Sequence, residues 1–357
     1  MTDRLANRLK ALRAQIQQAG ITGLYISNDA NVSYLIGVSG KDCALWITQS
    51  EAMILTDFRY MEMALSLSEL YEYQEIKVGS DACAFFTKRN DKQIGVEKNH
   101  LTMAEYLEFS ERIGNDRIVA TEHLVENLRE IKDDFEIEAT KKACSIADAC
   151  FSHICSFIKP GVSEKAIALE IEFFMKKNGA DDLSFDTICV SGANSSRPHG
   201  IPGEKLIEAG DFVTLDYGCK VQGYCSDMTR TVAVGYASNE MRSIYELVLL
   251  AQQTACDSIR AGLLCEDADS IARNIIVEAG YGEYFGHGLG HGTGLEIHEA
   301  PRLRPGYEGT LKENHIVSVE PGIYLPGRFG VRIEDLALVK PFGIINLTSS
   351  PKDLLIL

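Results

Sequence analysis

The sequence predicts a mixed α/β protein of two domains, and three observations lead to that fold class. The chain has 357 residues, which is long for a single hydrophobic core. Short strand-like segments alternate with helical ones over about the first 120 residues, which is typical of an α/β domain. The remaining residues combine helices with β-hairpins. We therefore expect an N-terminal α/β domain at 1–124, a linker at 125–134 and a second domain at 135–357.

The N-terminal domain is expected to begin with a helix, because leucine and isoleucine recur at helical spacing up to Gly20, a suitable stop. The strand-like segments GLYIS, CALWIT and AMILT follow, and further short strands are expected at 75–78, 94–97 and 118–120. This pattern does not indicate any chemistry. The charged segment ENLREIKDDFEIEATKK then has a helical composition, so we expect a linker that passes into a helix.

The second domain is expected to contain two pairs of helices. Apolar residues keep helical spacing over 140–158, and the Pro-Gly that follows should end this helix. A second helix is expected over 163–179. Asn239 is the expected cap of a long helix over 239–259, and a shorter one covers roughly 267–279. Each pair is tied to a β-hairpin, which suggests an internal pseudo-repeat.

Two predicted hairpins carry paired acids. In DFVTLDYGCKVQGYCSDMTRTVAV, residues 211–234, two apolar-rich runs flank a short polar turn. Asp216 and Asp227 are equidistant from that turn, so antiparallel pairing would place them opposite each other on one face. In HIVSVEPGIYLPGRFGVRIEDLALV, Glu320 and Glu334 are likewise equidistant from a turn glycine. Like charges placed opposite each other are destabilising, so either one acid of each pair is protonated or a cation lies between them.

Three of the eight histidines, His287, His291 and His298, fall between these hairpins. Four carboxylates and an imidazole suit two hard or borderline divalent ions that share bridging acids, and they suit a thiolate zinc site poorly. Glycines on alternate positions over 286–294 leave one face of an extended chain open to close approach of backbone or substrate. A phosphate-binding loop is the rival interpretation, but no Lys-Ser/Thr follows. We interpret His287 as a structural or surface residue.

Composition and charge narrow the class of protein. The net charge of −16 argues against nucleic acid and against anionic membranes as partners. No apolar run approaches the roughly 20 residues of a membrane span, and the polar start of the chain does not have the apolar core of a signal peptide. The ten cysteines are scattered without CxxC pairs, which favours free thiols in a reducing cytoplasm.

Five further segments stand out, in chain order LDYG, SDMTRT, HGTGLEIHE, VEPGIYLPG and VRIED. Together they resemble the Xaa-Pro aminopeptidase and prolidase family, the pita-bread metallopeptidases. The resemblance implies a creatinase-like N-terminal α/β domain and a pita-bread domain with a curved antiparallel sheet covered by helices. It also implies five metal ligands, which are Asp216, Asp227, His291, Glu320 and Glu334. The implied cofactor is two divalent ions per subunit, with manganese expected and cobalt or zinc as alternatives. The family also suggests a homodimer.

Hydrolysis of an amide needs a donor near the oxyanion and a proton for the departing amine. His199, in RPHG, and His298 are the candidates because neither is in the ligand set, and the resemblance places both near the substrate. It also implies that Glu320 shuttles the proton of the attacking water. Arg332 is expected to pair with a ligand carboxylate and fix it. A loop-ordering hydrogen bond is the alternative role for His199, and an ordinary surface arginine is the alternative for Arg332.

The resemblance implies hydrolysis of Xaa-Pro bonds, with release of the N-terminal residue from dipeptides or short peptides. Phe185 is a candidate wall for a proline ring, although a plain core phenylalanine fits equally well. Arg302 is a candidate for binding a C-terminal carboxylate, which would favour dipeptides. A solvated arginine is the alternative, so dipeptidase and aminopeptidase both stay open.

Two other functions remain as alternatives. The first alternative is a methionine aminopeptidase or a broad-specificity aminopeptidase. The sequence also resembles the methionine aminopeptidases, which share the ligand set, and this resemblance extends to HGIP at 199–202. The long N-terminal domain and the final ligand in VRIED argue against it. The second alternative is a metal-free relative, either a creatinase-type amidinohydrolase or a binding protein. Such relatives would be expected to have lost ligands, whereas all five are present here.

Overall fold

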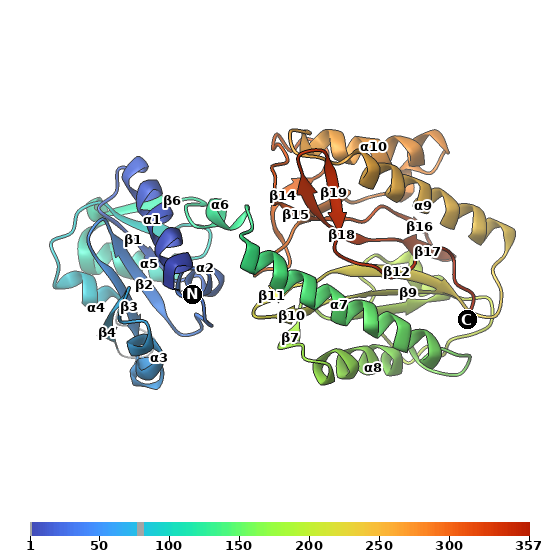
Figure 1. The fold of residues 1–357 in the computed structure, drawn as a ribbon, viewed down its shortest axis with the longest axis horizontal. Coiled ribbons are helices and arrows are strands. Elements are labelled where there is room, and N and C mark those ends of the chain that lie inside the picture. The colour runs from blue at the N-terminus through green and yellow to red at the C-terminus, as the bar shows by residue number, and fades with distance from the viewer. Residues whose placement is uncertain (1, 77–81) are drawn as a thin grey trace. The chain divides into compact units, whose positions relative to one another are not determined.

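The computed structural model describes residues 2–76 and 82–357, and the chain divides into two compact units, Met1–Arg129 and Glu130–Leu357. The division falls within the segment that the sequence assigns to the linker. Figure 1 shows the elements of both units. Among the described residues, no helix has the length and apolar character needed to cross a membrane.

The N-terminal unit contains a six-stranded mixed sheet in the order β4-β3-β2-β1-β5-β6, and the predicted α/β alternation is confirmed. The strands are β1 (Gly23–Ile26), β2 (Ala44–Thr48), β3 (Ala52–Thr56), β4 (Glu72–Glu75), β5 (Ile94–Glu97) and β6 (Ile118–Thr121). The helices are α1 (Thr2–Gln18), α2 (Asp29–Ile36), α3 (Met61–Ser66), α4 (Ala82–Thr87), α5 (Met103–Phe109) and α6 (Glu126–Arg129). The strand expected at 75–78 is observed three residues earlier as β4, and residues 77 and 78 lie outside the described residues.

The C-terminal unit contains the four predicted long helices. They are α7 (Asp134–Phe157), α8 (Glu164–Lys177), α9 (Asn239–Ser258) and α10 (Cys265–Glu278). The predicted cap of α9 is wrong by one residue, because the Ser238 hydroxyl accepts from the Met241 backbone N–H and Asn239 is already the first helical residue. Figure 1 shows α7 and α8 along one side of the strands and α9 and α10 along the other.

Antiparallel strands form the middle of this unit, in sheets ordered β11-β10-β7, β12-β9-β8, β14-β13-β15-β18-β19 and β16-β17. Those of the first half are β7 (Asp182–Leu183), β8 (Ile188–Ser191), β9 (Phe212–Tyr217), β10 (Cys219–Val221), β11 (Tyr224–Cys225) and β12 (Met228–Ala233). Those of the second half are β13 (Gly290–Gly292), β14 (Glu299–Leu303), β15 (Ile316–Val319), β16 (Gly322–Leu325), β17 (Phe329–Arg332), β18 (Asp335–Lys340) and β19 (Gly343–Asn346). Both halves run in the order helix pair, strand, loop and hairpin.

The register of the second acidic hairpin is confirmed. Strand β16 pairs with β17 through Gly322↔Arg332, and β15 pairs with β18 through Val319↔Asp335, so Glu320 lies opposite Glu334 between them.

The register of the first acidic hairpin is wrong by two residues. Strand β9 pairs Asp216 with Thr229, not with Asp227. The turn is Gln222-Gly223, where both residues have positive φ, one position further along than the sequence suggested. A shift of two residues keeps the same face, so Asp216 and Asp227 still point to the same side.

Candidate metal centre

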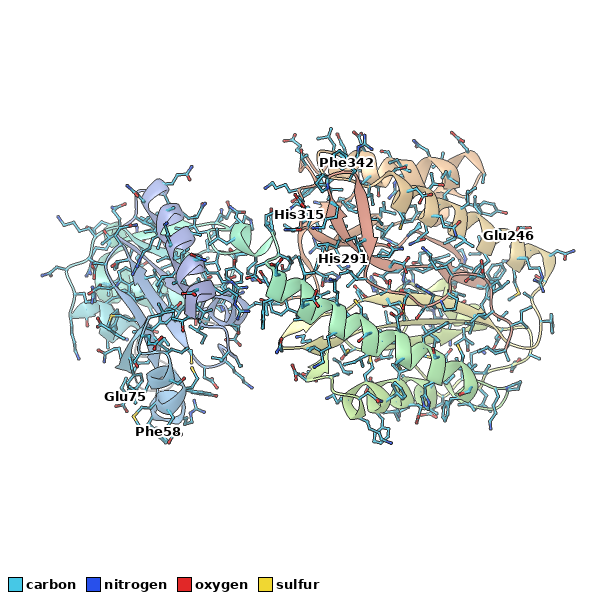
Figure 2. All side chains as sticks on the ribbon, viewed as in Figure 1. Phe58, Glu75, Glu246, His291, His315 and Phe342 are labelled. Atoms are coloured by element: carbon cyan, nitrogen blue, oxygen red, sulfur yellow. The ribbon has the colours of Figure 1, made fainter. Side chains whose placement is uncertain are left out.

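The structure brings all the predicted site residues to the wall of a single cavity in the C-terminal unit. The cavity has a volume of about 630 Å³. The predicted residues that line it are Phe185, His199, Asp216, Asp227, His291, His298, Arg302, Glu320, Arg332 and Glu334. Figure 2 labels His291 among the strands of this unit.

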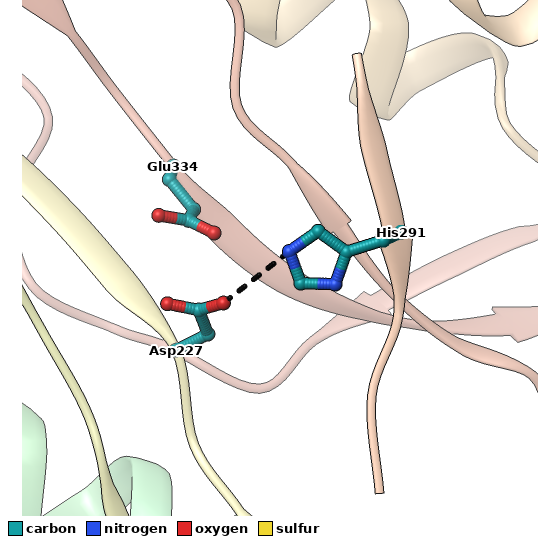
Figure 3. Close-up of side chains that lie close together, drawn as sticks. All are labelled: Asp227, His291 and Glu334. Carbon is teal, nitrogen blue, oxygen red and sulfur yellow. Dashed lines mark ion pairs between the residues drawn. The ribbon is translucent and has the colours of Figure 1, made fainter. Parts of the chain in front are cut away.

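The five predicted ligands come from the edges of the two hairpins and from the strand between them. Asp216 lies in β9 and Asp227 directly before β12, His291 lies in β13, and Glu320 and Glu334 lie where β15 passes to β16 and β17 passes to β18. The carboxylates of Asp227 and Glu334 face the imidazole of His291 (Figure 3), and possible donor atoms of these three lie within 4.8 Å of one another. His291 Nε2 is 3.6 Å from Asp227 Oδ2 and 3.3 Å from Glu320 Oε1.

Hydrogen bonds fix the orientation of these groups. His291 Nδ1 donates to the Gly292 carbonyl at 3.0 Å, which leaves Nε2 as the nitrogen that faces the carboxylates. The Ser318 hydroxyl accepts from the His291 backbone N–H and donates to Glu320 Oε1 at 2.9 Å. The Thr229 hydroxyl donates to Glu334 Oε2 at 2.6 Å. These hydrogen bonds hold His291, Glu320 and Glu334 in orientations that direct them towards one another.

Crowding of buried acids makes the cluster electrostatically costly. Burial, followed by the charges of Glu334 and Asp216, raises the pKa of Asp227 well above its usual value. Burial and then the charges of Glu320 and Asp216 raise the pKa of Glu334 in the same way. Burial also acts to raise the pKa of Glu320, but the hydrogen bond and charge of His291 outweigh it and lower the pKa to about 2.

The donor set fits divalent cations. Asp216 Oδ1 is buried and has no hydrogen-bond partner among the residues described. An unpartnered buried carboxylate oxygen beside three further acids is a site that a cation would satisfy. Oxygen donors with one imidazole match hard or borderline divalent ions.

Two residues that sequence reasoning missed, His287 and Tyr324, also line the cavity and are joined to Arg332 by hydrogen bonds. Arg332 Nη2 donates to Asp216 Oδ2 at 2.5 Å, and Nη1 donates to the Tyr324 hydroxyl at 2.8 Å. That hydroxyl lies 2.9 Å from His287 Nε2. His287, which we interpreted as structural or surface, is therefore a cavity residue. The sequence carried a signal for both, since His287 lies four residues before His291 and Tyr324 four after Glu320, a spacing that places side chains on one side of an extended chain.

The other predicted residues surround the ligand cluster. The His298 ring packs edge-on against His291 with centroids 4.5 Å apart. Burial, together with the charges of His291 and Arg302, lowers the pKa of His298 to about 4, so its ring is neutral at pH 7. His199 and Phe185 lie on the wall of the cavity, and Arg302 reaches it from β14.

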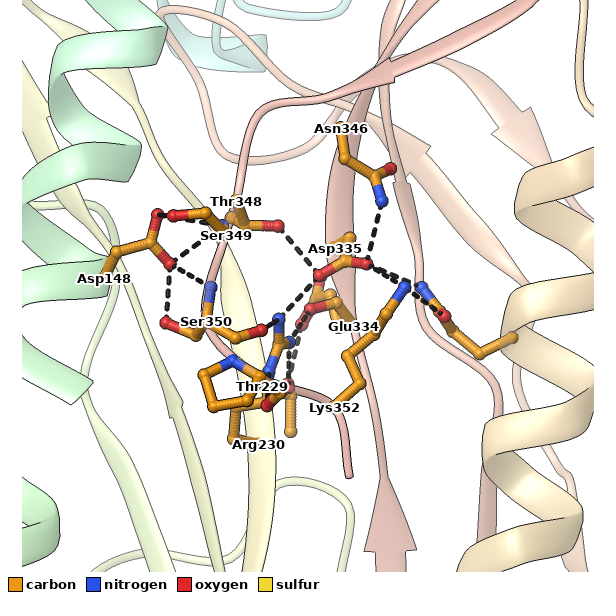
Figure 4. A network of polar contacts seen from close by, with 12 residues as sticks. Asp148, Thr229, Arg230, Glu334, Asp335, Asn346, Thr348, Ser349, Ser350 and Lys352 are labelled. Atoms are coloured by element: carbon orange, nitrogen blue, oxygen red, sulfur yellow. Dashed lines mark hydrogen bonds and ion pairs between the residues drawn. The ribbon is translucent and has the colours of Figure 1, made fainter. Parts of the chain in front are cut away.

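On the side of Glu334 away from the cavity, its backbone belongs to a network of polar contacts around Arg230 and Asp335 (Figure 4). The Arg230 guanidinium donates to the Glu334 carbonyl and to Asp335 Oδ1, the latter at 2.7 Å. Lys352 Nζ donates to Asp335 Oδ2 at 2.7 Å. Asp148 on α7 accepts the backbone N–H of Ser349 at 2.9 Å, so the C-terminal segment is fastened on both sides of Arg230. Through Arg230, this network holds the backbone carbonyl of Glu334.

Comparisons with known proteins agree with this geometry. Residues 138–341 match metallopeptidase family M24, and residues 8–131 match the creatinase/prolidase N-terminal domain. The Xaa-Pro dipeptidase of Pyrococcus furiosus is 36% identical over 98% of this chain and 100% of its own length.

Solved structures show the same likeness. The Xaa-Pro dipeptidase from Bacillus anthracis superposes with a TM-score of 0.95 at 44% identity, covering 99% of this chain and 100% of the other. The X-Pro aminopeptidase from Thermotoga maritima gives a TM-score of 0.87 at 34% identity, covering 96% of this chain and 100% of the other.

Proposed function

The chain belongs to metallopeptidase family M24, with a creatinase/prolidase N-terminal domain before the peptidase domain, and we propose that it hydrolyses Xaa-Pro peptide bonds. The observation that carries this proposal is the cluster of four acids and His291 in the wall of the cavity. The relatives named Xaa-Pro dipeptidase match along almost the whole chain, and this supports the same substrate class. The N-terminal domain argues against the methionine aminopeptidase alternative, and the complete ligand set argues against a metal-free relative.

The proposed cofactor is a pair of divalent ions held by Asp216, Asp227, His291, Glu320 and Glu334. Such ions polarise the scissile carbonyl and lower the pKa of water. We expect manganese, with cobalt and zinc as alternatives that the same donors accept.

The remaining residues act on the substrate and its protons. Glu320 accepts a proton from the attacking water and passes it towards the departing amine. His199 and His298 donate hydrogen bonds to the carbonyl oxygen as negative charge develops there. Arg332 holds Asp216 in place through the 2.5 Å contact of Nη2 with Oδ2.

We propose that Arg302 makes the enzyme favour dipeptides. Its side chain lines the cavity, and burial followed by the charge of Arg304 lowers its pKa. Within residues 2–76 and 82–357, no carboxylate forms an ion pair with it. The free carboxylate of an Xaa-Pro dipeptide supplies such a partner, and the apolar Phe185, which also lines the cavity, is the proposed contact for the proline ring.

The first test of this function is Asp227→Asn. An amide cannot supply the charge that a shared cation requires, so we expect bound metal to fall and hydrolysis of Ala-Pro to be abolished. Metal content by mass spectrometry and the rate of proline release measure the two effects. The matched control is Asp257→Asn, the same change at an exposed position on α9. Full metal occupancy with an unchanged rate would show that the ligand set is wrong.

The second test concerns specificity. The wild type with Mn²⁺ should cleave Ala-Pro faster than Ala-Pro-Gly, and should leave Met-Gly-Gly intact. Arg302→Gln should lower kcat/KM for Ala-Pro by about 10- to 100-fold, the value of a lost charged hydrogen bond, and change the tripeptide little. Cleavage of Met-Gly-Gly alone would assign the chain to the methionine aminopeptidases instead.

Assembly and compartment also belong to the proposal. All ten cysteines are free, which is consistent with a reducing compartment such as the cytoplasm. We expect a homodimer by analogy with the family. Light scattering of the purified chain measures the mass directly.

A further inference from the structure

His199 and His298 line the cavity without belonging to the ligand set, and both lie on loops. Within the part of the chain that the structure describes, neither ring forms a hydrogen bond to the protein. Their positions therefore depend on how the backbone of each loop is held. Each loop is fastened by one buried carboxylate that does not line the cavity, Glu164 in one case and Glu299 in the other.

Glu164 ties together both ends of the His199 loop. Its side chain, in the first turn of α8, is 0% exposed. Oε1 accepts from Ser191 N at 2.7 Å, Ser191 Oγ at 2.9 Å and Asn194 Nδ2 at 3.1 Å. Oε2 accepts from Gly203 N at 3.2 Å. One carboxylate thus joins residues twelve positions apart, and the segment 198–202 between them lines the cavity.

Glu299 fastens the His298 loop in a different way. Oε2 forms an ion pair with Lys132 Nζ at 3.0 Å, and the two side chains are 7% and 1% exposed. Oε1 accepts from the backbone N–H of Glu296 at 3.1 Å. A Cβ at Gly294 would lie 2.6 Å from Oε2, so the loop folds tightly around this carboxylate. His298 directly precedes Glu299 in the chain and is the last residue of this loop.

We propose that Glu164 is a positioning residue for His199, and that Glu299 with Lys132 is the corresponding positioning unit for His298. This inference rests on the proposed function, since it assigns how two of its proposed residues are held. An ionised carboxylate only accepts hydrogen bonds, and all five hydrogen bonds to the Glu164 carboxylate come from donors. A displacement of about 1 Å at a catalytic group can reduce the rate about 10²-fold.

Double-mutant cycles separate positioning from general damage. Glu164→Gln turns an N–H towards the Gly203 N–H and should lower kcat/KM for Ala-Pro about 10²-fold. In a His199→Ala background, Glu164→Gln should lower kcat/KM for Ala-Pro by no more than about 2-fold, because the imidazole that Glu164 positions is absent. In a His298→Ala background it should keep its full effect. Glu299→Gln should show the reverse pattern.

The control is Asp148→Asn, which loosens the C-terminal segment and holds neither histidine loop. Any loss that it causes should be the same factor in both histidine backgrounds. If Glu164→Gln also costs the same factor in both, the inference is overturned. Where Glu164→Gln does not fold, Asn194→Ala removes one donor and should give the same pattern with a smaller factor.

The buried charge of Lys132 needs a separate experiment, because Glu299→Gln removes the negative charge that lies 3.0 Å from its Nζ. Where that variant does not fold, Lys132→Met combined with Glu299→Leu removes both charges and enters the same cycle. Equal losses of kcat/KM in the His199→Ala and His298→Ala backgrounds would then show that Glu299 and Lys132 do not position His298.

Hydrogen–deuterium exchange of the full chain with Mn²⁺ gives a readout that does not require turnover. Glu164→Gln should raise exchange at 192–203 and leave 293–298 unchanged, and Glu299→Gln should do the opposite. Equal changes in both loops, or a loosened loop without the expected kinetic coupling, would overturn the inference. An inactive wild type would contradict the proposed function alone, because exchange would still decide whether each acid holds its loop.

Discussion

The burial of His315 makes the stability of the C-terminal unit depend on pH. Burial, followed by the charges of Lys132 and Lys312, lowers its pKa to about 3. Its Nδ1 accepts from the Lys312 backbone N–H at 3.2 Å. Its Nε2 is buried, lies 3.8 Å from Glu130 Oε2 and has no hydrogen-bond partner among the described residues. The native state therefore keeps this ring neutral.

This arrangement predicts a loss of stability in mild acid that depends on His315. Below about pH 6.5 the unfolded chain binds a proton on this ring, whereas the native state does not until about pH 3. The free energy of unfolding should fall as pH drops through that window. His315→Asn keeps an acceptor for Lys312 N and does not titrate. Urea unfolding at pH 7.5 and 5 should show that the wild type loses stability relative to this variant, and a constant difference would contradict the prediction.

At the scale of elements, strand β13 depends on glycines that allow two backbones to approach it closely. A Cβ at Gly290 would lie 2.0 Å from the Ser318 carbonyl oxygen, and a Cβ at Gly292 would lie 2.1 Å from the Ala300 carbonyl oxygen. Neither neighbouring backbone can retreat without moving its strand. Since β13 also carries His291, the same closeness sets the geometry of the candidate metal centre.

Gly290→Ala should therefore separate β13 from β15. We expect a loss of about 3 kcal/mol or more in the free energy of unfolding, together with weaker Mn²⁺ binding. The matched control is Gly286→Ala in the same segment, because a Cβ there would meet nothing within 4 Å. Its effect should stay within about 1 kcal/mol. Urea unfolding in EDTA and Mn²⁺ titration measure the two effects, and equal losses for both variants would show that close approach is not what β13 requires.

The two acidic hairpins show what sequence alone could and could not predict. The register of the second hairpin was predicted correctly from the equal distances of Glu320 and Glu334 from one turn glycine. The strand pairs on either side of these two acids, β15 with β18 and β16 with β17, have that same register. The first was wrong by two residues because the turn took the Gln222-Gly223 pair, a choice that depends on backbone conformation. A shift of two residues leaves each side chain on the same face of the strands, so Asp216 and Asp227 were still correctly predicted to be neighbours.

The contacts that join distant segments were not predictable in this way. A spacing of four residues relates His287 to His291 and Tyr324 to Glu320, but the hydrogen bond between His287 and Tyr324 spans 37 positions in the chain. The Lys132–Glu299 ion pair spans 167. Period and spacing act within one element or one hairpin, and they carry no information about which elements pack together.

At the scale of the whole molecule, the chain consists of two units, and the predicted ligands lie in only one of them. A ligand that binds one folded unit stabilises that unit alone, by about 2.7 kcal/mol at one hundred times its dissociation constant. The enthalpy of unfolding scales with the number of residues, so the Glu130–Leu357 transition should be the larger one.

Calorimetry of the full chain can test this division together with the location of the metal. In EDTA the four acids lie together without a cation, and adding Mn²⁺ should raise the midpoint of the larger transition only. Asp227→Asn should abolish that shift while leaving the smaller transition unchanged, which separates loss of metal from general destabilisation. If both transitions moved together with Mn²⁺, either the two units unfold as one or a second binding site lies in the N-terminal unit. If neither moved, the acids would have to be neutralised by their own protons, as the raised pKa values of Asp227 and Glu334 allow, and the metal assignment would be lost.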